Sequence, residues 1–107
     1  MSRRRSSSIQ PPDPTPSPPL RVVPGVRFRR DVERQKARGK NPAKLEALIE
    51  TLRTRRPLDA RHRDHALSGE WEGRRDCHVE PDWILIYMVA GTELRLYRTG
   101  THSDLFD

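Results

Sequence analysis

The feature that most constrains the fold is the apolar run Trp83–Val89, which stands between two turn signals. Glu80–Asp82, with proline at its centre, precedes the run, and Ala90–Thr92, with glycine at its centre, follows it. A run that is apolar at successive positions has no polar face, so it predicts a strand buried on both sides. Short turns on either side predict antiparallel neighbours. The run therefore predicts the central strand of a β-meander.

The segments that flank this run alternate in polarity, as strands with one buried face do. In Leu94–Arg98, the leucines at 94 and 96 are predicted to point inward. The segment before the central strand divides its side chains between two faces, with Arg74, Asp76 and His78 on one and Arg75, Cys77 and Val79 on the other.

Two helices are predicted ahead of the meander. The first covers Arg27–Arg38 and is expected to end at Gly39. The second runs from Pro42 to about Thr54, after an Asn41 N-cap, and its apolar stripe has helical spacing: Leu45, Leu48, Ile49 and Leu52. Residues 21–26 predict a weak edge strand or an entry loop. The fold class is therefore α+β, with an N-terminal helical hairpin packed on a small antiparallel sheet.

Residues 1–20 differ from the rest of the chain. They contain six prolines and a run of three serines, with Ile9 as the only large apolar residue of Ser2–Pro19. Such a segment buries too little apolar surface to offset the entropy of ordering it. We therefore expect a disordered Ser/Pro-rich arm over residues 1–20 and one folded domain over residues 21–107.

The chain is basic, with 21 Lys and Arg against 15 Asp and Glu, a formal net charge of +6. A basic body of this size favours a polyanionic partner such as nucleic acid, although a solvated charged surface is the alternative. One cysteine excludes an internal disulfide. No apolar run approaches the roughly 18–20 residues of a membrane span, and no secretory signal is present, so we expect a cytoplasmic protein.

The side chains that could carry out chemistry gather in the C-terminal half of the chain. Strand order predicts that His78, Asp82 and Arg98 meet at one rim of the sheet, because the turn at residues 80–82 joins the first two. Histidines beside a carboxylate and an arginine suit phosphodiester cleavage, in which the 2′-hydroxyl of RNA is the nucleophile. The candidates are His65, His78, Asp82, Arg98 and His102, with Phe106 as a stacking residue for a base.

Simpler interpretations exist for these residues. A histidine on the polar face of a strand is usually a surface residue. Cys77 is expected in the core, and His62 is expected in solvent within a charged loop. Zinc binding is disfavoured, because the sequence contains no close ligand pair such as Cys-x-x-Cys. Ser103 is interpreted as the cap of a terminal turn rather than as a nucleophile.

Several strings resemble one known family, the YafQ-type toxins of the RelE/ParE superfamily from bacterial type II toxin–antitoxin systems. They are Asp64-His65-x-Leu67-x-Gly69-x-Trp71, Arg74-x-Asp76-x-His78-Val79-x-Pro81-Asp82-Trp83, Leu85-x-Tyr87 and Arg98-Thr99-Gly100-Thr101-His102-Ser103-x-Leu105-Phe106. The resemblance covers about residues 27–106. The proline-rich arm has no counterpart in the family.

The resemblance implies a RelE-like fold and a ribosome-dependent, metal-free mRNA endonuclease without a cofactor. It implies a RelB/DinJ-like antitoxin as partner, with operator DNA bound only by the toxin–antitoxin complex. Its acid–base cluster matches His65, His78, Asp82 and His102, its phosphate-stabilising arginine matches Arg98, and its C-terminal aromatic matches Phe106. Arg74 and Arg75 are expected to contact the substrate.

Two alternatives remain open. One is a ParE-like toxin that acts on a protein such as DNA gyrase, which the histidine–aspartate cluster disfavours because ParE-type members lack it. The other is an RNA-binding or operator-binding protein without catalysis, for which the positive charge would suffice.

Overall fold

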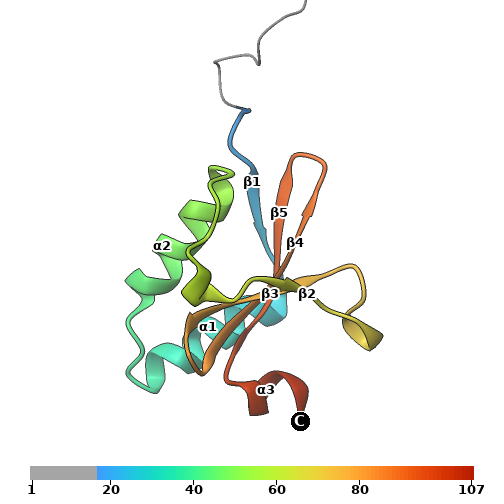
Figure 1. The fold of residues 1–107 in the computed structure, drawn as a ribbon. Coiled ribbons are helices and arrows are strands. Elements are labelled where there is room, and N and C mark those ends of the chain that lie inside the picture. Colours follow the sequence, from blue (N-terminus) through green and yellow to red (C-terminus); the bar gives the residue numbers. More distant parts are fainter. Residues whose placement is uncertain (1–16) are drawn as a thin grey trace, which may run out of the picture.

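The computed structural model describes residues 17–107, and the larger part of the predicted arm, residues 1–16, lies outside the described residues. The elements, shown in Figure 1, are β1 (Arg21–Pro24), α1 (Val26–Ala37), α2 (Pro42–Arg53), η1 (Ala60–His62), β2 (His65–Ala66), η2 (Gly69–Trp71), β3 (Arg75–Glu80), β4 (Trp83–Ala90), β5 (Glu93–Gly100) and α3 (His102–Phe106).

The α+β fold class is confirmed, and β4 is the central strand of the sheet. The strand order is β1-β5-β4-β3-β2, in which β3, β4 and β5 form the predicted antiparallel meander. The sheet is mixed rather than purely antiparallel, because β1 pairs parallel with β5. Leu20 and Val22 reach the core from this edge, so the pairing is supported by burial at the start of the chain.

The larger core lies between the sheet and the two long helices. Leu45, Leu48 and Leu52 of α2 pack with Phe28 of α1 onto the face of the sheet that carries Leu85. The helical stripe predicted for α2 is therefore its buried face. Asn41 caps this helix as predicted, because its side chain accepts a hydrogen bond from the Ala43 N–H at 3.0 Å.

A smaller core covers the opposite face of the sheet. It contains Ile84 and Ile86 of β4 together with Leu105 of α3, and partly buried aromatics surround it: Trp71, Tyr97 and Phe106. Since odd-numbered β4 residues face the helices and even-numbered ones face α3, the apolar run needs cover on both sides. The short helix α3 supplies part of that cover below the strands in Figure 1.

The folded region begins slightly earlier than the predicted boundary after residue 20. Leu20 is only 3% exposed, and its N–H donates to the carbonyl oxygen of Arg53 at 2.8 Å. A second contact joins the Arg55 side chain to the Pro18 carbonyl oxygen at 2.9 Å. The apolar side chain of Leu20 fills space beside α2, which composition alone did not indicate.

Helix α3 is capped by Thr101, not by Ser103 as the sequence suggested. The Thr101 hydroxyl accepts from the Asp104 N–H at 3.1 Å, and the Asp104 carboxylate accepts from the Thr101 N–H at 2.9 Å. This capping box also joins α3 to α1, since Arg38 donates to both Asp104 oxygens at 2.6 and 3.1 Å. Asp104 therefore fixes the helix that carries His102.

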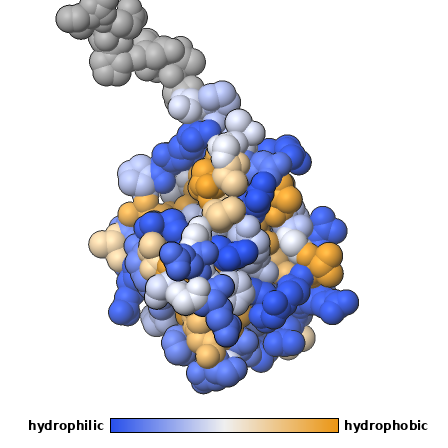
Figure 2. All heavy atoms as spheres, turned by 90° about the vertical axis from the view of Figure 1, so that its right-hand side faces the viewer, coloured by the Kyte–Doolittle hydropathy of each residue, from blue (hydrophilic) through white to orange (hydrophobic). Residues whose placement is uncertain are grey.

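The surface is largely hydrophilic, as Figure 2 shows for the side that lies to the right in Figure 1, where only small apolar patches are visible. Among residues 17–107, no helix is long and apolar enough to cross a membrane.

We predict that Asp104→Asn lowers the urea midpoint of unfolding at neutral pH. The hydrogen bonds from Arg38 hold the pKa of the Asp104 carboxyl well below its ordinary value. A carboxyl with a lowered pKa stabilises the fold above its ordinary value of 3.8, and this stability is lost as the pH falls through the lowered pKa.

The gap between wild type and Asp104→Asn should therefore be constant near neutral pH and shrink in acid. Asp107→Asn, at an exposed position at the end of the same helix, is the matched control and should follow wild type throughout. A gap that persists unchanged in strong acid would contradict the role given to the Asp104 charge.

Candidate active site

His65 stands on the short edge strand β2, directly opposite Asp76 of β3. Its Nδ1 lies 2.9 Å from the carbonyl oxygen of Arg63 and 3.0 Å from Oδ1 of Asp76. A carbonyl oxygen can only accept, so Nδ1 carries the proton. This tautomer leaves Nε2 of the exposed His65 ring able to accept a proton.

Asp76 is the residue of this region that the sequence analysis missed. Its side chain is buried, at 4% exposure, and Oδ1, although close to the His65 ring, has no hydrogen-bond partner within the part of the chain described. Burial raises the pKa of the Asp76 carboxyl, while the nearby imidazoles of His65, His78 and His102 oppose that shift. Of these three imidazoles, the ring of His65 is the one that lies against the Asp76 carboxylate, at 3.0 Å. The alternation of β3, which places Asp76 on the face of His78, was the signal that could have revealed it.

His78 and Asp82 lie on either side of the turn between β3 and β4. Nδ1 of His78 donates to the carbonyl oxygen of Pro81 at 3.0 Å, which again leaves Nε2 as the free acceptor. The Asp82 carboxylate is exposed and accepts from the backbone N–H of His102 at 3.0 Å. The turn therefore brings His78 and the start of α3 together.

His102 is the first residue of α3, and its ring is exposed. The ring centroid lies 5.0 Å from that of Phe106, with the two planes tilted by 48°. Since Phe106 packs against the smaller core, it holds the His102 ring from one side. His65, His78, Asp82, His102 and Phe106 are thus gathered on the face of the sheet opposite α2.

Arg98 has a different environment from the one predicted. Cross-strand register places it in one row with Asp76, with Ile86 between them. Its guanidinium, however, donates to both carboxylate oxygens of Asp31 in α1, at 2.6 and 3.2 Å, and its side chain is only 11% exposed. Asp31 also accepts from the Thr99 N–H at 3.1 Å. Arg98 is therefore engaged in a buried ion pair.

The two neighbouring arginines lie on opposite faces of β3. Arg75 faces the helices and donates to the Asp64 carboxylate at 3.2 and 3.3 Å, so it does not join the histidines. Arg74 lies on their face, with its guanidinium carbon 4.5 Å from the ring centroid of Tyr97 and 5.9 Å from that of Trp71. Aromatic stacking rather than an acidic partner holds the Arg74 cation.

Other residues considered from the sequence are explained by packing. Cys77 is fully buried, as predicted, and burial raises the pKa of its thiol. His62 is not simply solvated, because its Nδ1 lies 2.6 Å from the carbonyl oxygen of His78. Within residues 17–107, no group of three or more His, Cys, Asp and Glu side chains is placed to hold a metal ion.

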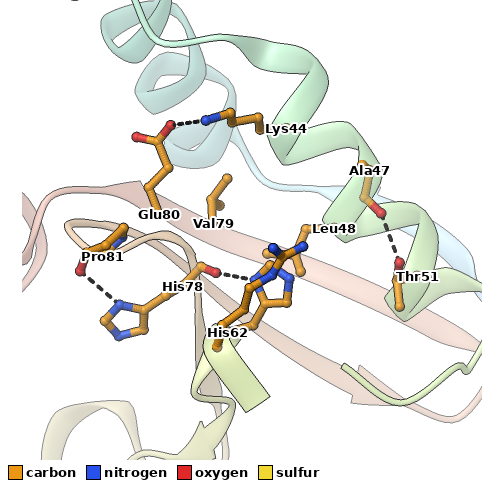
Figure 3. Close-up of a pocket in the computed structure, with 10 residues that line it drawn as sticks. Lys44, Ala47, Leu48, Thr51, His62, His78, Val79, Glu80 and Pro81 are labelled. Carbon is orange, nitrogen blue, oxygen red and sulfur yellow. Dashed lines mark hydrogen bonds and ion pairs between the residues drawn. The ribbon is translucent and has the colours of Figure 1, made fainter. Parts of the chain in front are cut away.

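One cavity borders this cluster. Its volume is about 530 Å³, and it lies between α2, η1 and the end of β3 (Figure 3). His78 is the only member of the histidine cluster that lines it. His65, Asp82 and His102 are exposed at the surface around the smaller core.

The fold and this cluster define a small basic α+β protein with histidines and carboxylates gathered on one face of its sheet. Comparison with known proteins identifies the group to which it belongs. Residues 20–107 match the family described as "Bacterial toxin of type II toxin-antitoxin system, YafQ". The chain belongs to the YafQ toxin family.

The relatives agree in sequence and in structure. The chain is 48% identical over 80 residues to the "mRNA interferase toxin YafQ" of Escherichia coli (strain K12). The aligned segment covers 74% of this chain and 87% of that protein. YafQ from E. coli strain BL21(DE3) has a TM-score of 0.79 at 42% identity, covering 82% and 99% of the two chains. A chain of the E. coli DinJ–YafQ toxin–antitoxin complex has a TM-score of 0.76 at 43% identity, covering 82% and 98%.

We predict that Asp31→Ala lowers the free energy of unfolding by about 3–5 kcal/mol, because it leaves the buried Arg98 cation without its partner. Urea denaturation measures this loss. Glu33→Ala on the same helix, where the carboxylate is 73% exposed, should change stability by less than about 0.5 kcal/mol.

Adding Arg98→Met to Asp31→Ala should restore part of the lost stability, since no buried charge then remains. Fully additive losses in the double variant would show that the two side chains do not depend on each other.

Proposed function

We propose that residues 21–107 form a toxin domain that cleaves messenger RNA on the ribosome, without a metal ion, by attack of a ribose 2′-hydroxyl. The observation that supports this most is the gathering of three histidines, His65, His78 and His102, on one face of the sheet, with the buried carboxylate of Asp76 3.0 Å from Nδ1 of His65. In two of them, His65 and His78, hydrogen bonds through Nδ1 leave Nε2 free for proton transfer.

The proposed reaction needs two proton transfers and no external nucleophile. A neutral imidazole removes the proton of the 2′-hydroxyl, whose oxygen forms a bond to the neighbouring phosphorus. The bond from phosphorus to the 5′-oxygen breaks, and a protonated imidazole gives that oxygen its proton. The products are a 2′,3′-cyclic phosphate and a 5′-hydroxyl. RNA supplies the nucleophile, so the protein needs only acids, bases and cations.

The roles follow from position. His102, exposed at the start of α3, is the first choice for direct proton transfer, and Phe106 beside it is suited to stack on a base. Asp82 fixes the backbone of His102. Arg74, which has aromatic rather than acidic neighbours, is suited to contact a phosphate. Arg98 would support the same phosphate only in competition with Asp31, and Arg75 would contact RNA beyond the cluster.

Dependence on the ribosome is supported by the exposed histidines and the net positive charge. His65 and His102 lie at the surface and offer RNA few sequence-specific contacts, while a charge of +6 favours association with ribosomal RNA. The E. coli relatives carry the name mRNA interferase toxin. A messenger RNA substrate would place the protein in the cytoplasm.

The proposed partner is an antitoxin of the RelB/DinJ type, with operator DNA bound only by the complex. The E. coli relative is known in complex with DinJ. Gel filtration of the protein mixed with the product of its neighbouring gene should show one joint peak. Separate elution of the two proteins would argue against this partner.

The cleavage proposal is tested by induced expression followed by primer extension on cellular mRNA. Wild type should produce cuts in phase with codons, and His102→Ala should lose them, because a proton-transfer group contributes about 10²–10⁴-fold to the rate. Ser103→Ala, at the next exposed position of α3, is the control and should cut as wild type does.

Intact mRNA in cells whose growth is still arrested would reject the proposal. Altered DNA supercoiling under those conditions would indicate a gyrase-directed toxin. Cuts that persist in His102→Ala would remove this histidine from the mechanism.

A further inference from the structure

The cavity beside the histidine cluster takes no part in the proposed cleavage chemistry, and its lining suits a ligand of its own. Its floor is apolar and includes Leu48 and Val79, and its edge carries His62 and Lys44 (Figure 3). The exposed Arg61 also lines it. A volume of about 530 Å³ lies within the usual range of small-molecule and cofactor sites. An apolar floor with a few polar groups at the edge suits a flat, partly polar ligand such as a nucleobase.

The charge around the cavity favours a ligand that carries an anion. Among the described residues that line it, Glu80 is the single acid, and this carboxylate is already paired with Lys44 at 2.8 Å and with Lys40 at 3.0 Å. Arg61 makes no ion pair within residues 17–107 and is exposed at the cavity edge. The edge therefore has more positive than negative charge, as a site beside a phosphate requires.

His62 provides a specific contact for a base. Its Nδ1 donates to the carbonyl oxygen of His78 at 2.6 Å, so the neutral ring keeps Nε2 as an acceptor. An exocyclic amino group of a base is the matching donor. The same hydrogen bond joins the cavity to the cluster, because His78 contributes its backbone to His62 and its ring to the candidate active site.

We propose that this cavity is a nucleotide subsite that holds the base of a nucleotide flanking the cleaved bond. The inference rests on the proposed cleavage of RNA and adds a source of nucleotide preference to it. His78 belongs to both sites, because its ring lies with the cluster and its backbone borders the cavity on the other side of the sheet, so an RNA strand that bends around the end of β3 reaches both. The base then rests on Leu48 and Val79, with Arg61 near the adjoining phosphate.

The test is the nucleotide preference of the cuts, read by primer extension in cells. Ala47 is exposed on α2 and lines the cavity, so Ala47→Trp fills the subsite without removing any group of the cluster. Cutting should continue, but at the favoured nucleotide it should slow by about tenfold, as expected for the loss of one base contact. Preference at one position beside the cut should disappear.

Ala43→Trp is the matched control, because Ala43 is also exposed on α2 but does not line the cavity. It should keep the wild-type preference. Arg61→Ala is the second variant, which removes the cation without adding bulk and should weaken cutting in the same direction. If Ala47→Trp does not fold, the cutting rate and nucleotide preference of Arg61→Ala test the subsite.

The outcomes separate this inference from the proposed function. If Ala47→Trp and Arg61→Ala both cut with the rate and nucleotide preference of wild type, the subsite is overturned while the proposed cleavage stands. Loss of antitoxin binding in Ala47→Trp, with unchanged cutting, would overturn it in favour of an antitoxin side chain as occupant. Absence of cuts in wild type would overturn both.

Discussion

Burial of the central strand on both faces is the constraint on which the rest of the structure depends. β4 has no polar face, so the chain must cover it from two sides. Within residues 17–107, the helices α1 and α2 cover one side, and the short elements α3 and η2 cover the other. Those pieces are short, so they bury Ile84 and Ile86 but leave the polar side chains around this core, such as His65 and His102, exposed. The candidate active site occupies that face, so its exposure follows from the small size of the elements that cover it.

A small domain with a shallow site must hold its side chains by means other than enclosure. Here backbone carbonyls fix two imidazole rings through Nδ1, and a carboxylate fixes the start of α3. Asp104 of that short helix also accepts hydrogen bonds from Arg38, which caps the end of α1. A helix of this length has little stability of its own, so these contacts decide where the His102 ring lies. Hydrogen bonding replaces the packing that a deeper site would provide.

Much of this fold could be predicted from periodicity and turn residues. The apolar run of β4, the alternation of β3 and the leucine stripe of α2 each occupy the positions that the pattern indicates. The parallel pairing of β1 with β5 could not be predicted, since β1 is only four residues long and its partner is distant in sequence. Local sequence patterns do not indicate which distant strands pair. The burial of Leu20 in the core could not be predicted for the same reason.

The two buried carboxylates, Asp31 and Asp76, show what pattern reading misses in a site. Each looks like an ordinary surface acid in a chain that is 34% charged, and only the tertiary contacts reveal its environment. Asp31 takes up the charge of Arg98, while Asp76 lies beside His65 with one oxygen free of hydrogen bonds among the described residues. Nδ1 of His65 lies 2.9 Å from the Arg63 carbonyl oxygen and 3.0 Å from the Asp76 carboxylate, so the buried acid helps to set the orientation of an exposed imidazole ring. Asp76 is therefore placed to position His65, and only the tertiary contacts distinguish it from a surface acid.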